Sequence, residues 1–179
     1  MKTGELMHRW MLIGAMTLAT AAHAQQVDLK SLDKFAGIAK GVTQINLDES
    51  MIKSASGALN DKKGDEAAAK KTASGLKGLY LRVFEFDKKG AYKFEDLKPI
   101  RDQLKAPEWT VFLQSRESDE QTEIWIHRTS GEADGILLFA AESNELVVIN
   151  ALGIGRPEDL SKIGKQFGVP LPGVGDKRE

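Results

Sequence analysis

The sequence predicts an α+β domain: a mostly antiparallel sheet of about five strands, with helices packed on a face and a helical N-terminal half. Apolar residues recur at helical spacing between Asp28 and Leu76. Leu79 to Phe86 then carries apolar residues at both alternating sets of positions. Four strand-length segments follow from Trp109, and their short polar links favour an antiparallel meander.

Three helices are expected in the first half, over residues 28–41, 50–59 and 65–76. Ser50 is the candidate N-cap of the second helix. The third is rich in alanine and closes at Gly75 or Gly78. Gln44 to Leu47 is interpreted as a short strand or an extended link.

The segment Leu79 to Phe86 indicates a strand covered on two sides, so Leu81 and Val83 are expected in the core. Arg82 lies inside this apolar run, and its guanidinium must reach water or a carboxylate because an unpaired buried charge is costly. Glu85 falls on the opposite face by alternation. A structural ion pair with another element is therefore favoured over a ligand site for Arg82.

An amphipathic helix is predicted from Phe94 to Leu104. The four strands that follow span residues 109–116, 122–128, 135–142 and 145–152. Pro157 sits in the first turn of a last helix. We expect one domain over residues 25–170 and a loose tail over 171–179.

The first 24 residues resemble a secretory signal peptide. Lys2 and Arg9 precede the apolar run Trp10 to Ala22, and the triplet ending at Ala24 is an A-x-A cleavage site with Ala22 at its start. Gln25 is the expected first mature residue. The run is shorter than the roughly 20 residues that a membrane anchor needs, and the alternative of a buried N-terminal helix does not explain the A-x-A site.

The mature protein is therefore expected to be periplasmic or secreted. Glu5 is unusual in the positive region of a signal peptide, and Met7 is an alternative start. The sequence has no cysteine, so neither a disulfide nor a lipid-modified N-terminal cysteine can form. We expect no stable membrane insertion after cleavage.

The charges nearly balance, with 25 basic and 26 acidic residues, which argues against a nucleic acid as partner. His127 is the single histidine after the predicted cleavage site. It lies about 13 Å along a strand from Glu123 by strand rise, so these two cannot share a metal, and we expect no metal site and no cofactor.

No serine lies in a G-x-S-x-G elbow. Gly153-Ile154-Gly155 lacks the third glycine of a dinucleotide loop, because Glu158 occupies that position, and is interpreted as a tight turn. Asp87 to Gly90 is a turn, since its two lysines are incompatible with a calcium loop. We therefore expect no catalytic residue.

Residues 75–92, GLKGLYLRVFEFDKKGAY, together with Asp102-Gln103-Leu104, Trp109 and the segment GKQFG over residues 164–168, resemble domain-of-unknown-function family 4252. These are small exported bacterial proteins. The resemblance covers most of the mature chain and implies a bacterial envelope protein of the same fold. It implies no activity, substrate or catalytic residue.

The leading hypothesis is an exported, non-enzymatic protein-interaction module, linked to envelope signalling and binding another envelope protein. Candidate contact residues are Arg82 and the face formed by Glu123, Trp125 and His127, which is expected to be half-exposed; sheet edges are also candidates. One alternative is a binder of small apolar ligands between sheet and helices. Another is a hydrolase that uses carboxylates alone.

Overall fold

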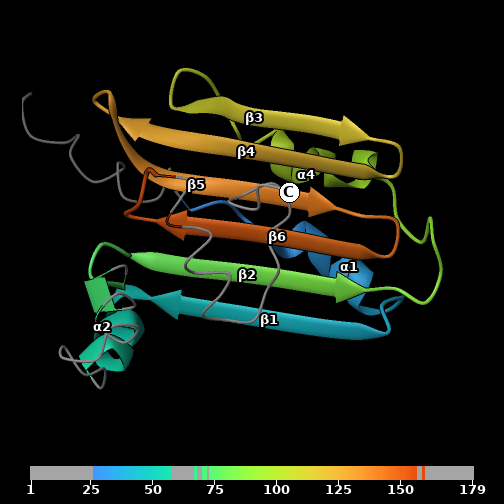
Figure 1. The fold of residues 1–179 in the computed structure, drawn as a ribbon, viewed down its shortest axis with the longest axis horizontal. Coiled ribbons are helices and arrows are strands. Elements are labelled where there is room, and N and C mark those ends of the chain that lie inside the picture. Colours follow the sequence, from blue (N-terminus) through green and yellow to red (C-terminus); the bar gives the residue numbers. More distant parts are fainter. Residues whose placement is uncertain (1–25, 58–66, 68–69, 72, 157–158, 160–179) are drawn as a thin grey trace, which may run out of the picture.

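Six strands pair into a single antiparallel sheet in the computed structural model (Figure 1). The structure describes residues 26–57, 67, 70–71, 73–156 and 159. The strands are β1 (Gly41–Asp48), β2 (Gly78–Glu85), β3 (Trp109–Glu117), β4 (Glu120–Thr129), β5 (Glu132–Ala141) and β6 (Glu145–Leu152). Their order across the sheet is β1-β2-β6-β5-β4-β3.

This order follows from one long connection. After β2 the chain crosses to the far edge of the sheet and forms β3, and three hairpin links then bring it back to β6 beside β2. β6, the last strand along the chain, therefore lies between β2 and β5. Every residue of β6 after Glu145 is buried. The two edges of the sheet are β1 and β3.

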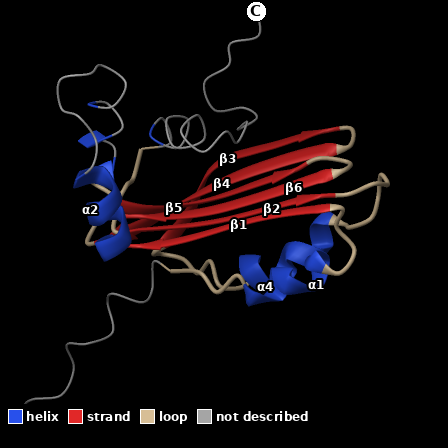
Figure 2. Cartoon of the chain, turned by 90° about the horizontal axis from the view of Figure 1, so that it is seen from below, coloured by secondary structure: helices blue, strands red, loops and turns tan. Residues whose placement is uncertain are grey.

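Short helices flank the sheet (Figure 2). They are the 3-10 helices η1 (Lys30–Leu32) and η2 (Phe94–Leu97) and the α-helices α1 (Asp33–Ala36), α2 (Glu49–Gly57) and α4 (Lys98–Arg101). In Figure 2, α1 and α4 lie against one broad face of the sheet, whereas α2 lies at the end of the strands. We call the first of these the helix-covered face.

Strand alternation divides the core between the two faces. Phe84 and Phe139 pack on the helix-covered face with Leu32, Phe35 and Leu97 from the helices. Alternate residues of the same strands point to the opposite face, including Leu79, Leu81, Ile124, Leu138 and Ile149. Each such side chain stabilises the fold by roughly 1.5–3 kcal/mol through removal of apolar surface from water.

The prediction of a strand covered on both sides is confirmed for β2. Leu81 is 2% exposed on one face and Phe84 is 1% exposed on the other. Val83, which was also expected in the core, is only partly buried. The four predicted C-terminal strands are confirmed as β3 to β6, and their antiparallel meander is confirmed as well.

The prediction of five strands and a helical N-terminal half is wrong. Residues 41–48 form a full edge strand, and the helical segment before it ends at Ala36. The apolar residues Leu29, Leu32 and Phe35, which predicted a long first helix, are buried. The short helices η1 and α1 are enough to place them in the core. Five of the eight residues of β1 are exposed, so its apolar periodicity is weak and the sequence indicates only a short strand or an extended link there.

Two helix boundaries also differ from expectation. The cap of α2 is Asp48, whose carboxylate accepts hydrogen bonds from the Met51 backbone and the Ser50 hydroxyl, at 2.8 and 2.7 Å. The predicted helix from Phe94 to Leu104 is shorter, as η2 followed by α4. Most of the predicted third helix, the last helix and the tail fall outside the described residues. Within the described part, no helix is both long and apolar enough to cross a membrane.

The glycines after β6 form a tight turn, as predicted. Gly153 has a φ of +86°, and its backbone N–H donates to the Asp134 carbonyl at 2.6 Å. A Cβ at Gly153 would lie 2.3 Å from the Gly75 carbonyl oxygen. The turn is therefore closed by protein backbone and presents no open cradle for a phosphate.

Candidate functional site

Glu123, Trp125 and His127 share the helix-covered face of β4, but that face is not half-exposed as expected. Glu123 is 0% exposed and His127 is 2% exposed. Arg101 of α4 reaches Glu123, and the Trp109 ring lies with its centroid 5.0 Å from that of His127. Alternation correctly placed the three residues on one side of β4, but it does not reveal which elements later cover that side.

The Glu123 carboxylate is surrounded by hydrogen-bond donors. Its Oε1 accepts from Arg101, Gln114 and Gln121 at 3.2, 2.7 and 3.4 Å, and its Oε2 accepts from the Trp125 indole at 3.0 Å. A buried carboxylate with this many partners is satisfied in place. Glu123 thus holds α4, β3 and β4 together rather than facing a ligand. Arg101, which lies in the apolar stripe of its predicted helix, was not recognised as a site residue from the sequence.

His127 is bonded on one nitrogen alone. Its Nδ1 lies 2.7 Å from Oδ1 of Asp134 on the neighbouring strand β5. Its Nε2 is buried and has no hydrogen-bond partner in the part of the chain that the structure describes. Asp134 is seven residues away in the chain, and nothing in the sequence pattern indicated that the two would pair.

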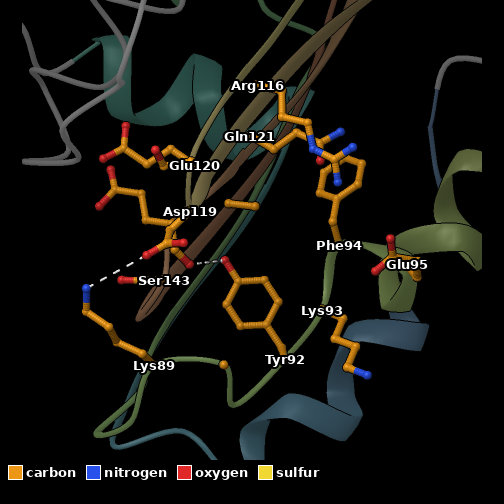
Figure 3. Close-up of a pocket in the computed structure, with 14 residues that line it drawn as sticks. Lys89, Tyr92, Lys93, Phe94, Glu95, Arg116, Asp119, Glu120, Gln121 and Ser143 are labelled. Atoms are coloured by element: carbon orange, nitrogen blue, oxygen red, sulfur yellow. Dashed lines mark hydrogen bonds and ion pairs between the residues drawn. The ribbon is translucent and has the colours of Figure 1, made fainter.

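Two hollows open at the two ends of β3. The first, of about 520 Å³, is lined by His127, Pro107, Glu108 and the residues of the β4–β5 turn. The second, of about 440 Å³, lies beside the β3–β4 turn and the β5–β6 turn. Figure 3 shows Tyr92, Phe94 and Arg116 around the second hollow, with Lys89 reaching towards Asp119.

Tyr92, which lines the second hollow, contacts two backbone carbonyls. The Tyr92 hydroxyl lies 2.6 Å from the Glu142 carbonyl oxygen and 2.7 Å from that of Glu145. Burial, together with the carboxylates of Glu142 and Glu145, raises the pKa of Tyr92. Burial also raises the pKa of Glu145, and the nearby carboxylates of Glu142 and Glu85 raise it further. The phenol therefore stays protonated and ties the loop after β2 to the β5–β6 turn.

Arg82 lies on the helix-covered face near the β1 edge. Its guanidinium donates to the Asn46 side chain at 2.8 Å and to the Leu81 carbonyl at 2.9 Å. Desolvation lowers the pKa of Arg82, and the Asp33 carboxylate partly opposes this effect. Among the described residues no carboxylate lies within ion-pair distance, so the expected ion pair is replaced by two hydrogen bonds to neutral oxygens.

The outer edge strand β3 is the most exposed strand of the sheet. Seven of its nine residues are exposed, and Val111 and Phe112 are 49% and 56% exposed. The register with β4 shifts between Val111 and Leu113, so Phe112 is the extra residue of a β-bulge. At the opposite edge of the sheet, β1 exposes a single large apolar side chain, Val42, at 47%.

Acidic side chains do not gather into a metal site in the described part of the chain, where no three His, Cys, Asp or Glu residues could hold an ion together. Asp96 accepts hydrogen bonds from the Lys93 backbone and from the Lys34 side chain.

Comparison with protein-family models gives a match over residues 38–163 to the family described as Domain of unknown function (DUF4252). The chain belongs to this family. No match was found among curated proteins.

The DUF4252 match contains all six strands, both hollows and the candidate residues Arg82, Glu123, Trp125 and His127. The segment that precedes it contributes Leu32 and Phe35 to the core. The buried network on β4 and the open edge at β3 thus both lie within the part of the chain that defines the family.

Proposed function

We propose that this DUF4252 protein is an exported bacterial envelope protein that acts as a non-enzymatic interaction module. Its partner is another envelope protein, which adds an extended segment to the open edge of β3. The observation that carries this proposal is the exposure of Val111 and Phe112, which are adjacent on a strand that has no outer neighbour among the described strands.

Edge strands bind extended peptides because their outward N–H and C=O groups are unpaired. The backbone supplies affinity in this mode of binding, and side-chain pockets supply specificity. The bulge at Phe112 interrupts the regular edge, which discourages indiscriminate pairing while it presents an aromatic side chain. The hollows at both ends of β3 flank the path of such a segment.

Export is supported by the sequence of the first 24 residues and by the position at which the folded core begins. The Val27 backbone donates to the buried Asn150 side chain at 3.0 Å, and Leu29 is 5% exposed. The core therefore begins within a few residues of the proposed cut after Ala24. N-terminal sequencing of the mature protein is expected to begin at Gln25.

The two alternatives have less support. The space between the sheet and the helices is filled by Phe35, Phe84 and Phe139, whose rings pack there with other core side chains. The buried carboxylate of Glu123 already accepts hydrogen bonds from four donors. An apolar ligand would have to displace these core side chains, and a hydrolysis that used Glu123 would have to displace its four donors.

A cross-linking pull-down from periplasmic extract, with one charged variant at each edge, tests the proposal. Phe112→Lys places a charge on β3, which opposes strand addition, and should reduce recovery of the partner at least tenfold. Val42→Lys is the matched control at the β1 edge and should recover the partner as wild type does. Equal recovery with Phe112→Lys, or loss with Val42→Lys alone, would reject β3 as the binding edge.

A further inference from the structure

The free edge of β3 has an apolar part and a charged part. Because of the bulge, Val111 and Phe112 both stand opposite Trp125 of β4. Val111 and Phe112 are exposed, and Trp125 is partly buried against the core of the helix-covered face. We call these three residues the edge patch. An extended segment that adds to β3 covers this patch best with a large apolar side chain, because that removes apolar surface of both partners from water.

Arg116 is the charged residue of β3 on the same face. It pairs with Gln121, which by alternation points to the same side of β4 as Trp125. The next residue of β3, Glu117, points to the opposite face by the same alternation. Arg116 is exposed, and no carboxylate of the described residues lies within ion-pair distance of it. Its charge is therefore available to a partner.

Other charges near Arg116 belong to other elements. Arg116 is the one charged residue of β3 that lines the hollow beside the β3–β4 turn (Figure 3). In that turn, the Asp119 carboxylate lies 4.0 Å from the Lys89 ammonium group. The buried carboxylate of Glu123 already has four donors. A strand that pairs with β3 therefore has Arg116 as its charged cross-strand neighbour on this face.

The register of β3 and β4 sets the distance between the two parts of the edge. Trp125 and Gln121 are four residues apart on β4, which corresponds to about 13 Å by strand rise. The edge patch and Arg116 stand opposite these two residues and are separated by a similar distance. Side chains four residues apart in an extended segment lie on one face. A segment with an apolar side chain over the edge patch thus places the fourth residue along at Arg116.

Arg116 selects among such segments by charge. A basic or apolar residue at this position would desolvate the guanidinium without supplying a counter-charge, which is unfavourable. An aspartate or glutamate there forms charge-assisted hydrogen bonds with it. Charged side chains on edge strands oppose pairing with unsuitable segments, and specificity often depends on such a penalty against the wrong partner.

We propose that the segment bound by β3 carries a large apolar residue and, four residues away, an aspartate or glutamate that pairs with Arg116. This inference rests on the proposed function, because it names the chemistry of the envelope-protein segment that adds to β3. The edge patch holds the apolar residue, and Arg116 determines the charge that the edge accepts.

The first test compares short soluble peptides that differ in one charge. Each has a phenylalanine and, four residues away, either a glutamate or a lysine, and both orders along the peptide are made because a strand can add in either direction. Fluorescence anisotropy of a dye on the peptide measures binding to the whole mature protein. The glutamate peptide should bind at least about threefold more tightly than the lysine peptide, on the scale of exposed ion pairs. High salt should reduce this preference.

Charge reversal at Arg116 provides the decisive variant. Arg116→Glu should bind the lysine peptide more tightly than the glutamate peptide, a reversal that a merely structural role of Arg116 does not produce. Lys40→Glu is the matched control, because it makes the same change of charge at an exposed residue next to β1, and it should keep the wild-type preference. Equal binding of both peptides by wild type, no binding of either, or a reversal in Lys40→Glu as well, would overturn the proposal.

The pull-down from periplasmic extract distinguishes this inference from the proposed function. Arg116→Glu should reduce recovery of the envelope partner, as Phe112→Lys does. If Phe112→Lys loses the partner and Arg116→Glu retains it, β3 is the binding edge but the selection by charge is wrong. If Phe112→Lys retains the partner, the proposed function fails and this inference fails with it.

Discussion

Three polar side chains on the helix-covered face are buried in different ways. Glu123 accepts hydrogen bonds from four donors, which compensate for the burial of its carboxyl group. Asn150 accepts from the Val27 backbone and donates to the Ile136 carbonyl. His127 is bonded through Nδ1 to Asp134, and its Nε2 is buried without a hydrogen-bond partner among the described residues. The first two residues therefore stabilise the packing of neighbouring segments, and His127 pairs β4 with β5 through Asp134.

The Arg101–Glu123 pair should contribute measurably to stability. Arg101→Met removes the cation and leaves a fully buried carboxylate with its remaining neutral donors, so the free energy of unfolding should fall by about 1–3 kcal/mol. Arg116→Met is the matched control, because Arg116 is an exposed arginine on the neighbouring strand, and surface changes cost within about 0.5 kcal/mol. Urea denaturation of both variants measures the difference; equal losses would show that the pair contributes nothing.

Glu145 should give the protein a distinctive pH dependence. Its folded-state pKa is raised above 4.5, so folding favours the protonated form, and this contribution is lost as pH rises through the folded pKa. Glu145→Gln should therefore be more stable than wild type at pH 7, and the gain should vanish below about pH 4.5. Thermal melts across this pH range measure the effect.

Asp96 is the comparison with the opposite sign. A hydrogen bond from the Lys93 backbone, with help from Lys34, lowers the pKa of Asp96 below 3.8. Its contribution is present at neutral pH and is lost as pH falls through the lowered pKa. Asp96→Asn should be less stable than wild type at pH 7, with the difference shrinking in acid. Shifts of the same sign in both variants would contradict this account of the two carboxylates.

At the scale of single elements, β2 contributes side chains to the core on both faces of the sheet. Leu81→Ala should lower the free energy of unfolding by about 2–5 kcal/mol, through lost transfer energy and a cavity. Val83→Ala, on the same face but only partly buried, should cost clearly less. Chemical denaturation compares the two variants. Similar losses of stability would mean that the side chains of β2 on the face opposite the helix-covered face are not tightly packed.

Arg82→Met on the same strand should be close to neutral for stability. The substitution removes a desolvated cation, while the exposed Asn46 side chain can turn to water. If Arg82 instead contacts a partner, recovery in the pull-down will fall while the melting temperature stays the same. A destabilisation above roughly 3 kcal/mol would show that the guanidinium has a buried partner whose loss is not compensated.

The sequence predicted elements where burial imposes a strict pattern and failed where it does not. β2, β5 and β6 are apolar runs bounded by turn residues, and these strands, together with β3 and β4, were located within a few residues. β1 has Gln44 and Asn46 on its exposed positions and only Ile45 and Leu47 partly buried, which is too weak a signal for a strand of its length. The His127–Asp134 pair depends on a bulge, and a bulge leaves no trace in apolar periodicity.

For the whole molecule, the topology explains where an interaction surface can lie. The return of the chain from β3 to β6 buries the middle of the sheet and leaves β1 and β3 as its edges. α2 lies at the end of β1, whereas β3 has exposed apolar side chains and a hollow at each end. The central claim is therefore that a partner segment pairs with β3.

Site-specific photo-cross-linking in intact cells tests this claim most directly. A photoreactive amino acid is placed at Phe112 on β3 or at Val42 on β1, and the covalent products are compared. The account predicts a discrete adduct with one envelope protein from position 112, and none of that adduct from position 42. The adduct should disappear when Val111→Lys is added to the same chain. An adduct formed from position 42 but not from position 112, or no adduct from either position, would contradict it.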